Sequence, residues 1–166
     1  MPDDLSRERA DLLEALTAHR GFLRQTIEGL SPEQIRTRST VSELTLASIV
    51  KHVAATEATW AAFARGGTAA FADMGPEQWM EEWRVPEDAT AESLLAAYAE
   101  VAATTDALVR ELDLDVDHAL PDAPWFPPDG RRSVRRVWIH VVAETAQHAG
   151  HADIIREAID GQKTMG

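Results

Sequence analysis

The stretch VWIHVVAETAQHAGHADII, residues 137–155, decides the fold class of this chain. At about 100° of rotation per residue, one face of a helix over these residues advances in alternating steps of four and three. That spacing is typical of a helix packed into a bundle. The residues on this face are Val137, Val141, Glu144, His148, His151, Ile155 and then Ala158 or Ile159. A carboxylate and two imidazoles therefore stand at three consecutive positions where a bundle helix would bury aliphatic side chains.

These three polar residues, with His140 one turn before Glu144, predict a site for a divalent metal ion. Burial of unpaired ionisable groups costs several kcal/mol each, and a metal ion would give every lone pair a partner. A hydrogen-bonded network without metal is the alternative interpretation. A solvent-facing cluster is disfavoured, because Val137, Val141 and Ile155 lie within about 40° of one another with the polar residues between and beside them.

Length and composition indicate a single domain over residues 1–166. Apolar residues make up 45% of the 166 residues and are rich in alanine, which favours helices. The chain has no cysteine, so it offers neither a disulfide framework nor a thiolate. Any metal ligands must therefore be nitrogen and oxygen atoms.

The formal net charge of −12 excludes the usual partners of basic proteins. Such an acidic chain is a poor candidate for binding nucleic acid or an anionic membrane surface. The start MPDDLSRERADLL lacks the charged-then-apolar pattern of a signal peptide, and no apolar run approaches the roughly 18 residues of a membrane span. We expect a soluble cytoplasmic protein.

Apolar periodicity and capping residues predict an all-α four-helix bundle of the up-and-down type. The four helices are expected over residues 5–30, from Ser42 or Thr45 to residue 65, over 90–112 and over 133–160. Two long crossover connections, 68–89 and 113–132, join them, and the first is compatible with a short helix after Pro76. The aromatic residues of these connections either cover a pocket or seal one end of the bundle, and the sequence leaves both possibilities open.

His52 lies at the shoulder of the apolar stripe of the second helix, and its helical neighbours Ser48, Ala55, Thr56 and Thr59 are all small. Small neighbours leave the space that a metal with an open coordination position requires. A half-buried histidine without a ligand role is the alternative. The cluster on the last helix nevertheless makes His52 the natural additional ligand from a facing helix.

Four arginines crowd the start of the last helix, where the helix dipole disfavours cations. They are Arg131, Arg132, Arg135 and Arg136. Pairing with surface carboxylates is the simplest explanation. The functional alternative is an anion-binding rim, in which Arg136, one turn before His140, holds a carboxylate of a substrate.

A histidine in the second helix and the motif E-T-A-Q-H-A-G-H in the fourth resemble the DinB-like metalloenzyme superfamily. Matched residue by residue, the resemblance implies His52, Glu144 and His148 as metal ligands. The glutamate version of the motif is similar to the branch that contains the mycothiol-dependent maleylpyruvate isomerases and the mycothiol S-transferases. The isomerases carry an additional C-terminal domain, whereas this sequence ends at Gly166, so the stand-alone transferase is the expected analogue.

The resemblance implies an enzyme in which a low-molecular-weight thiol such as mycothiol binds the metal as a thiolate and attacks an electrophilic small molecule. Three protein ligands leave a coordination position open, and the ion lowers the pKa of the thiol. Zinc is the expected metal, although nickel, iron or manganese suit the same ligand atoms. In this scheme His151 accepts a proton or supports the site by hydrogen bonding, and His140 orients Glu144.

Two other functions stay open at this point. One is a metal-dependent hydrolase or isomerase that uses bound water or thiol. The other is a non-catalytic metal-binding or structural bundle, for which a homodimer is a natural form. The sequence identifies neither the electrophile nor the physiological thiol.

Overall fold

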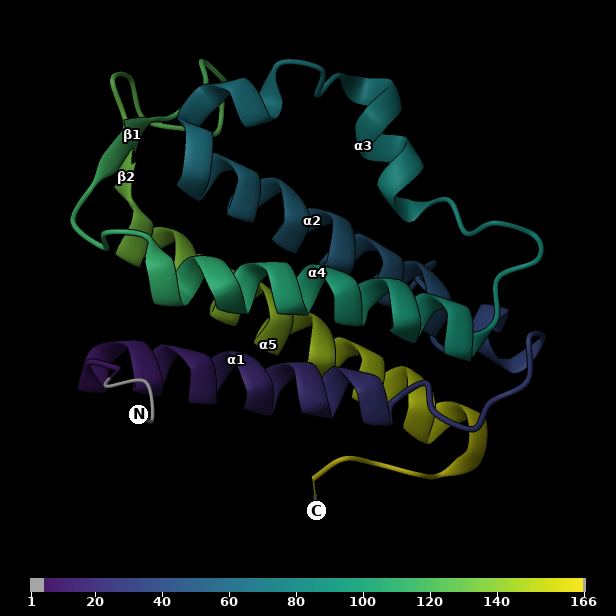
Figure 1. Cartoon of the computed structure of the whole chain (residues 1–166). Coiled ribbons are helices and arrows are strands. Elements are labelled where there is room, and N and C mark those ends of the chain that lie inside the picture. The colour runs from purple at the N-terminus through teal and green to yellow at the C-terminus, as the bar shows by residue number, and fades with distance from the viewer. Residues whose placement is uncertain (1–4, 166) are drawn as a thin grey trace.

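The protein is described by a computed structural model, and the structure describes residues 5–165. Residues 1–4, which belong to the N-terminal stretch considered above for a signal peptide, and Gly166 lie outside the described residues. Four long helices form the molecule: α1 (Arg7–Gln25), α2 (Leu46–Gly66), α4 (Ala91–Glu111) and α5 (Val134–Asp160). They lie side by side in Figure 1, with α1 packed mainly against α5 and α2 packed against both α4 and α5. The predicted all-α helical bundle is confirmed.

The connections contain the remaining elements: η1 (Gln34–Arg36), η2 (Gly67–Phe71), α3 (Pro76–Trp83), β1 (Asp117–Ala119) and β2 (Arg131–Ser133). The connection from α2 to α4 runs the length of the bundle, so these two helices point in the same direction, and α5 points the opposite way (Figure 1). The antiparallel packing of α2 and α5 brings the start of α2 beside the second half of α5. None of the helices in the described part of the chain is long and apolar enough to cross a membrane.

Three of the long helices begin at the capping residues that the sequence predicts. The Thr45 hydroxyl accepts a hydrogen bond from the Ser48 N–H, and the Ser48 hydroxyl accepts one from the Thr45 N–H. Thr90 and Ser133 cap α4 and α5 in the same way, each accepting from a backbone N–H three residues on. The backbone N–H groups of the first turn have no partner within the helix, and these hydrogen bonds satisfy some of them. Each helix therefore has a defined start.

The first helix is shorter than predicted, because α1 ends at Gln25 instead of residue 30. Thr26 follows it, and its hydroxyl donates to the carbonyl of Leu23 at 2.7 Å. The chain then turns at Gly29, whose φ of +75° is a left-handed conformation that glycine adopts without strain.

The core contains two adjoining apolar clusters, and its largest fully buried side chains are Trp138, Tyr98 and Phe63. The core also buries an ion pair between Arg20 and Glu57, at 2.5 Å, with side-chain exposures of 7% and 0%. Tyr98 donates a hydrogen bond to the same carboxylate. Buried charges in the described core are therefore matched with partners, as their desolvation requires.

A short antiparallel ladder, which the sequence did not predict, closes the connection between α4 and α5. Its register pairs Asp117 with Ser133, and His118 with Arg132. Three-residue strands have too little alternation for a sequence pattern to reveal them. The ladder matters for the site because it fixes the backbone of Arg132 immediately before α5.

Candidate metal centre

His52, Glu144 and His148 converge, each offering a ligand atom within 4.8 Å of the others. Oε1 of Glu144 lies 3.4 Å from Nε2 of His148 and 3.8 Å from Nε2 of His52. Two atoms that share a tetrahedral zinc ion at about 2.0–2.1 Å are about 3.3 Å apart. The three side chains therefore fit a divalent ion with little adjustment.

The backbone explains why these residues meet. Glu144 and His148 lie one turn apart on α5, so their side chains project from the same face. His52 lies near the start of α2, which packs against α5 in the opposite direction. A facing helix thus supplies the third ligand atom without strain on the other two.

Contacts within the cluster shift the pKa values of Glu144 and His52. Contacts with His148, and then with His52, hold the pKa of the Glu144 carboxyl far below its usual range. Burial lowers the pKa of His52, but its contacts with Glu144 and Glu82 outweigh burial and raise it above the usual value. The site therefore presents an ionised carboxylate beside two imidazoles, a set of side chains that could hold a divalent ion.

Glu82 and Trp83, at the end of α3, complete the surroundings of His52. Oε2 of Glu82 lies 3.3 Å from Nδ1 of His52. The ring of Trp83 stacks on that of His52, with centroids 3.7 Å apart and planes inclined by 12°. Together these contacts restrict the orientation of the His52 ring.

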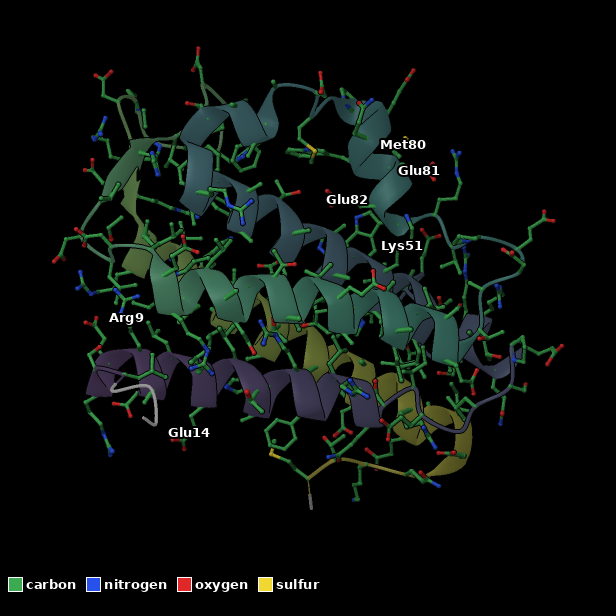
Figure 2. The ribbon with its side chains drawn as sticks, in the orientation of Figure 1. Arg9, Glu14, Lys51, Met80, Glu81 and Glu82 are labelled. Atoms are coloured by element: carbon green, nitrogen blue, oxygen red, sulfur yellow. The ribbon has the colours of Figure 1, made fainter. Side chains whose placement is uncertain are left out.

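The short helix α3 is held over α2 near this point. The Lys51 ammonium group donates to the carbonyl oxygen of Glu81. Figure 2 shows Glu81 and Glu82 at the end of α3 that lies above Lys51. No sequence pattern indicated that Glu82 lies beside His52, because the face of α3 that packs on α2 was not predictable.

An aromatic cavity of about 530 Å³ opens beside the candidate ligands. Its walls come from α2, α3, α5 and both long connections, and include Trp60, Phe71, Trp79, Trp83, Trp125 and Phe126. The ring centroids of Trp79 and Trp125, one from each connection, lie 4.6 Å apart. The loop aromatics therefore cover a pocket, which was one of the two possibilities that the sequence left open.

His140 lies on the wall of this cavity, with its ring centroid 4.8 Å from that of Trp60. Burial, and then the charge of Arg132, lower the pKa of His140 below its usual value, which favours the neutral imidazole. Within residues 5–165 no hydrogen bond joins His140 to Glu144. The predicted orienting role of His140 stays a prediction, while its position favours contact with a substrate.

The other two predicted residues lie outside the cavity wall. His151 is partly buried on α5, one turn beyond His148, and is not among the three converging residues. Arg136 is exposed, and the arginine that lines the cavity is Arg132. The sequence pattern did not distinguish these two arginines, because the ladder that places Arg132 was not predictable.

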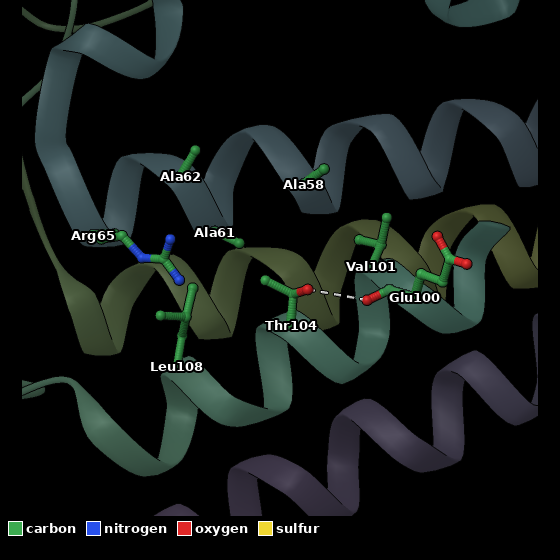
Figure 3. Close-up of a pocket in the computed structure, with 8 residues that line it drawn as sticks. All are labelled: Ala58, Ala61, Ala62, Arg65, Glu100, Val101, Thr104 and Leu108. Atoms are coloured by element: carbon green, nitrogen blue, oxygen red, sulfur yellow. Dashed lines mark hydrogen bonds between the residues drawn. The ribbon is translucent and has the colours of Figure 1, made fainter.

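A second hollow, of about 260 Å³, lies between α2 and α4 (Figure 3). Its wall is mostly apolar: Ala58, Ala61, Ala62, Arg65, Glu100, Val101, Thr104 and Leu108. Glu100 is the only carboxylate in this wall, and the Thr104 hydroxyl donates to the backbone carbonyl of Glu100 at 3.1 Å. This hollow lacks a cluster of metal ligands, so the aromatic cavity is the candidate functional site.

Comparison with known proteins identifies the family of this chain. Among curated proteins, and among solved structures, none matches the chain. The family model described as mycothiol-S-transferase matches residues 11–161, which include His52, Glu144, His148 and the walls of the aromatic cavity. The match spans nearly all of the chain, and the protein therefore belongs to the mycothiol S-transferase family, a DinB-like branch.

Proposed function

We propose that this protein is a metal-dependent mycothiol S-transferase in which His52, Glu144 and His148 hold the metal ion. The observation that carries the proposal is the convergence of their ligand atoms, within 4.8 Å, at the wall of a cavity of about 530 Å³. That volume lies in the range of small-molecule sites. Membership of the family supports mycothiol as the thiol.

Zinc is the metal that this ligand set favours. Two imidazoles and one carboxylate leave a fourth position for a substrate, as in catalytic zinc sites. Nickel, iron and manganese bind the same atoms, so the metal is identified by elemental analysis of protein purified without added metal. When bound, the ion supplies a positive charge that lowers the pKa of a thiol, which then reacts as a thiolate at neutral pH.

The chain's own residues provide the rest of the chemistry. Thr56 and Thr59 leave room beside His52 for the thiol, and the aromatic walls hold the electrophile and exclude water. His140, on the same wall, accepts the thiol proton. The sulfur forms a bond to carbon of the electrophile, and the leaving group departs with the electrons of the bond that breaks.

The proposal is tested by thiol consumption with mycothiol and a chlorodinitrobenzene as model electrophile. Metal-loaded protein should consume thiol and electrophile together, and the reaction should stop when mycothiol is omitted. Loss of electrophile at the same rate without thiol would instead indicate a hydrolase. Full metal occupancy with no turnover of several model electrophiles would favour a non-catalytic metal-binding bundle.

Three further predictions from the sequence are part of this proposal. They are a single domain over residues 1–166, a cytoplasmic location and, as one option, a homodimer. Limited proteolysis, cell fractionation and light scattering test them separately.

A further inference from the structure

The guanidinium group of Arg132 lies half-buried at the wall of the aromatic cavity, and one of its nitrogen atoms is buried without a partner. Its Nη1 atom is inaccessible to solvent and forms no hydrogen bond within residues 5–165. The arginines on either side differ, since Arg131 pairs with Asp117, and Arg135 pairs with Glu8 and Asp115. Burial, followed by the nearby charge of Arg136, lowers the pKa of Arg132, which is the direction expected of a cation that lacks a compensating anion.

The surroundings hold this unpaired cation in place. Its central carbon lies 4.6 Å from the ring centroid of Trp60 and 5.4 Å from that of Phe126. The backbone of Arg132 is fixed by its pairing with His118 in the ladder, and the next residue, Ser133, caps α5. Aromatic faces attract a guanidinium group but do not satisfy its N–H donors.

A buried N–H donor without a partner is costly, and a planar guanidinium group binds a carboxylate through two parallel hydrogen bonds. No carboxylate of the described chain pairs with Arg132, so the carboxylate of a ligand is a suitable partner for it. The cavity is continuous from Arg132 past His140 to Glu144 and His52, so a single ligand can contact both ends.

The length of that ligand follows from the helix. Ser133 and Glu144 are separated by about 16 Å along α5 at 1.5 Å per residue, and the Arg132 side chain bridges part of this distance. The wall between them is aromatic and suits a flat apolar body. We propose that the electrophile of this transferase carries a carboxylate, held by Arg132, at the far end of a planar apolar body from its reactive carbon.

This inference rests on the proposed function, so its test has one arm that needs turnover and one that does not. The turnover arm compares a bromomethylbenzoate with its methyl ester, each corrected for its uncatalysed reaction with mycothiol. The wild-type protein should show a kcat/KM for the carboxylate about 10- to 100-fold higher than for the ester, as a charge-assisted pair of hydrogen bonds gives. In Arg132→Met this preference should disappear through a raised KM for the carboxylate, so that the carboxylate and the ester react with similar kcat/KM.

The binding arm uses calorimetry with toluate and toluamide, which have no leaving group. Wild-type protein should bind toluate more tightly, and Arg132→Met should bind the two equally. Arg132→Lys, which keeps the charge but not the planar fork, should retain part of the preference. Circular dichroism and metal content should be the same in all variants, and Arg110→Met, an exposed arginine of α4, is the matched control for loss of one charge.

The outcomes separate this inference from the transferase function. If wild-type protein binds toluate and toluamide equally, or if Arg132→Met keeps the preference, the inference is wrong. It is also wrong if Arg136→Met removes the preference in place of Arg132→Met, or if Arg132→Met raises the KM for mycothiol only. If no electrophile reacts but toluate binding depends on Arg132, the anion site stands and the transferase function fails.

Discussion

The carboxylate of Glu82 lies 3.3 Å from Nδ1 of His52, whereas Nε2 of the same ring faces Glu144 at 3.8 Å. Nδ1 is buried and has no well-aligned hydrogen bond within the described residues. A carboxylate at this position favours the tautomer that carries its proton on Nδ1, which would leave the Nε2 lone pair available for a metal. We therefore expect Glu82 to act as a positioning residue of the candidate metal centre.

Replacement of Glu82 by Gln should weaken metal binding by about 10- to 100-fold, the usual cost of losing a partner behind a ligand histidine. Competition with a chromophoric chelator measures this affinity without any assay of turnover. Glu81→Gln is the matched control, because the Glu81 side chain is exposed and pairs with Arg84, while the backbone carbonyl that accepts from Lys51 is unchanged by the substitution. Equal affinities for the wild type and Glu82→Gln would show that Glu82 does not support the site.

His151→Ala should keep stoichiometric metal. Its position is seven residues beyond Glu144, about 10 Å along the helix axis, and the ligand atoms that converge are those of His52, Glu144 and His148. Elemental analysis after purification decides the matter. Loss of metal as complete as in His148→Ala would make His151 a ligand.

The buried pair of Arg20 and Glu57 should dominate the stability of the core. Arg20→Met would leave the Glu57 carboxylate buried with only Tyr98 as a donor, and this should lower the free energy of unfolding by about 3–5 kcal/mol. Urea denaturation of the metal-free protein measures the change. The exposed pair of Arg7 and Asp11 provides the control.

In that control, Arg7→Met should change the free energy of unfolding by less than about 1 kcal/mol, as is typical of surface ion pairs. The double variant Arg20→Met with Glu57→Gln should recover part of the loss, because it removes the uncompensated charge. A single Arg20→Met variant as stable as the wild type would show that solvent reaches Glu57.

Much of this structure could be predicted from helical periodicity. The apolar spacing of residues 137–155 predicted that Glu144 and His148 lie on one face of a helix. The capping residues Thr45, Thr90 and Ser133 predicted the starts of three helices. These features depend on contacts within one turn, which sequence spacing records directly. The convergence of His52 with the α5 residues is a tertiary contact, and it was expected from the inferred bundle, the small neighbours of His52 and the family resemblance.

The remainder depends on tertiary contacts that no spacing encodes. Glu82 reaches His52 only because Lys51 and Trp83 fix α3 on α2. Arg132, and not Arg136, lines the cavity because a three-residue ladder directs the chain before α5. The sequence identified the arginine cluster and the aromatic loops but could not orient them.

The central claim is that His52, Glu144 and His148 hold a metal ion that the transferase reaction requires. Metal content and mycothiol-dependent turnover, measured on the same preparations of wild type, His148→Ala and the control His19→Ala, test it most directly. His19 lies on α1, away from the converging ligand atoms, and contacts the ring of Phe22. If these three residues hold the ion, the wild type and His19→Ala should contain one ion per chain and turn over fully, and a folded His148→Ala should lose both. Full metal content in His148→Ala would contradict it.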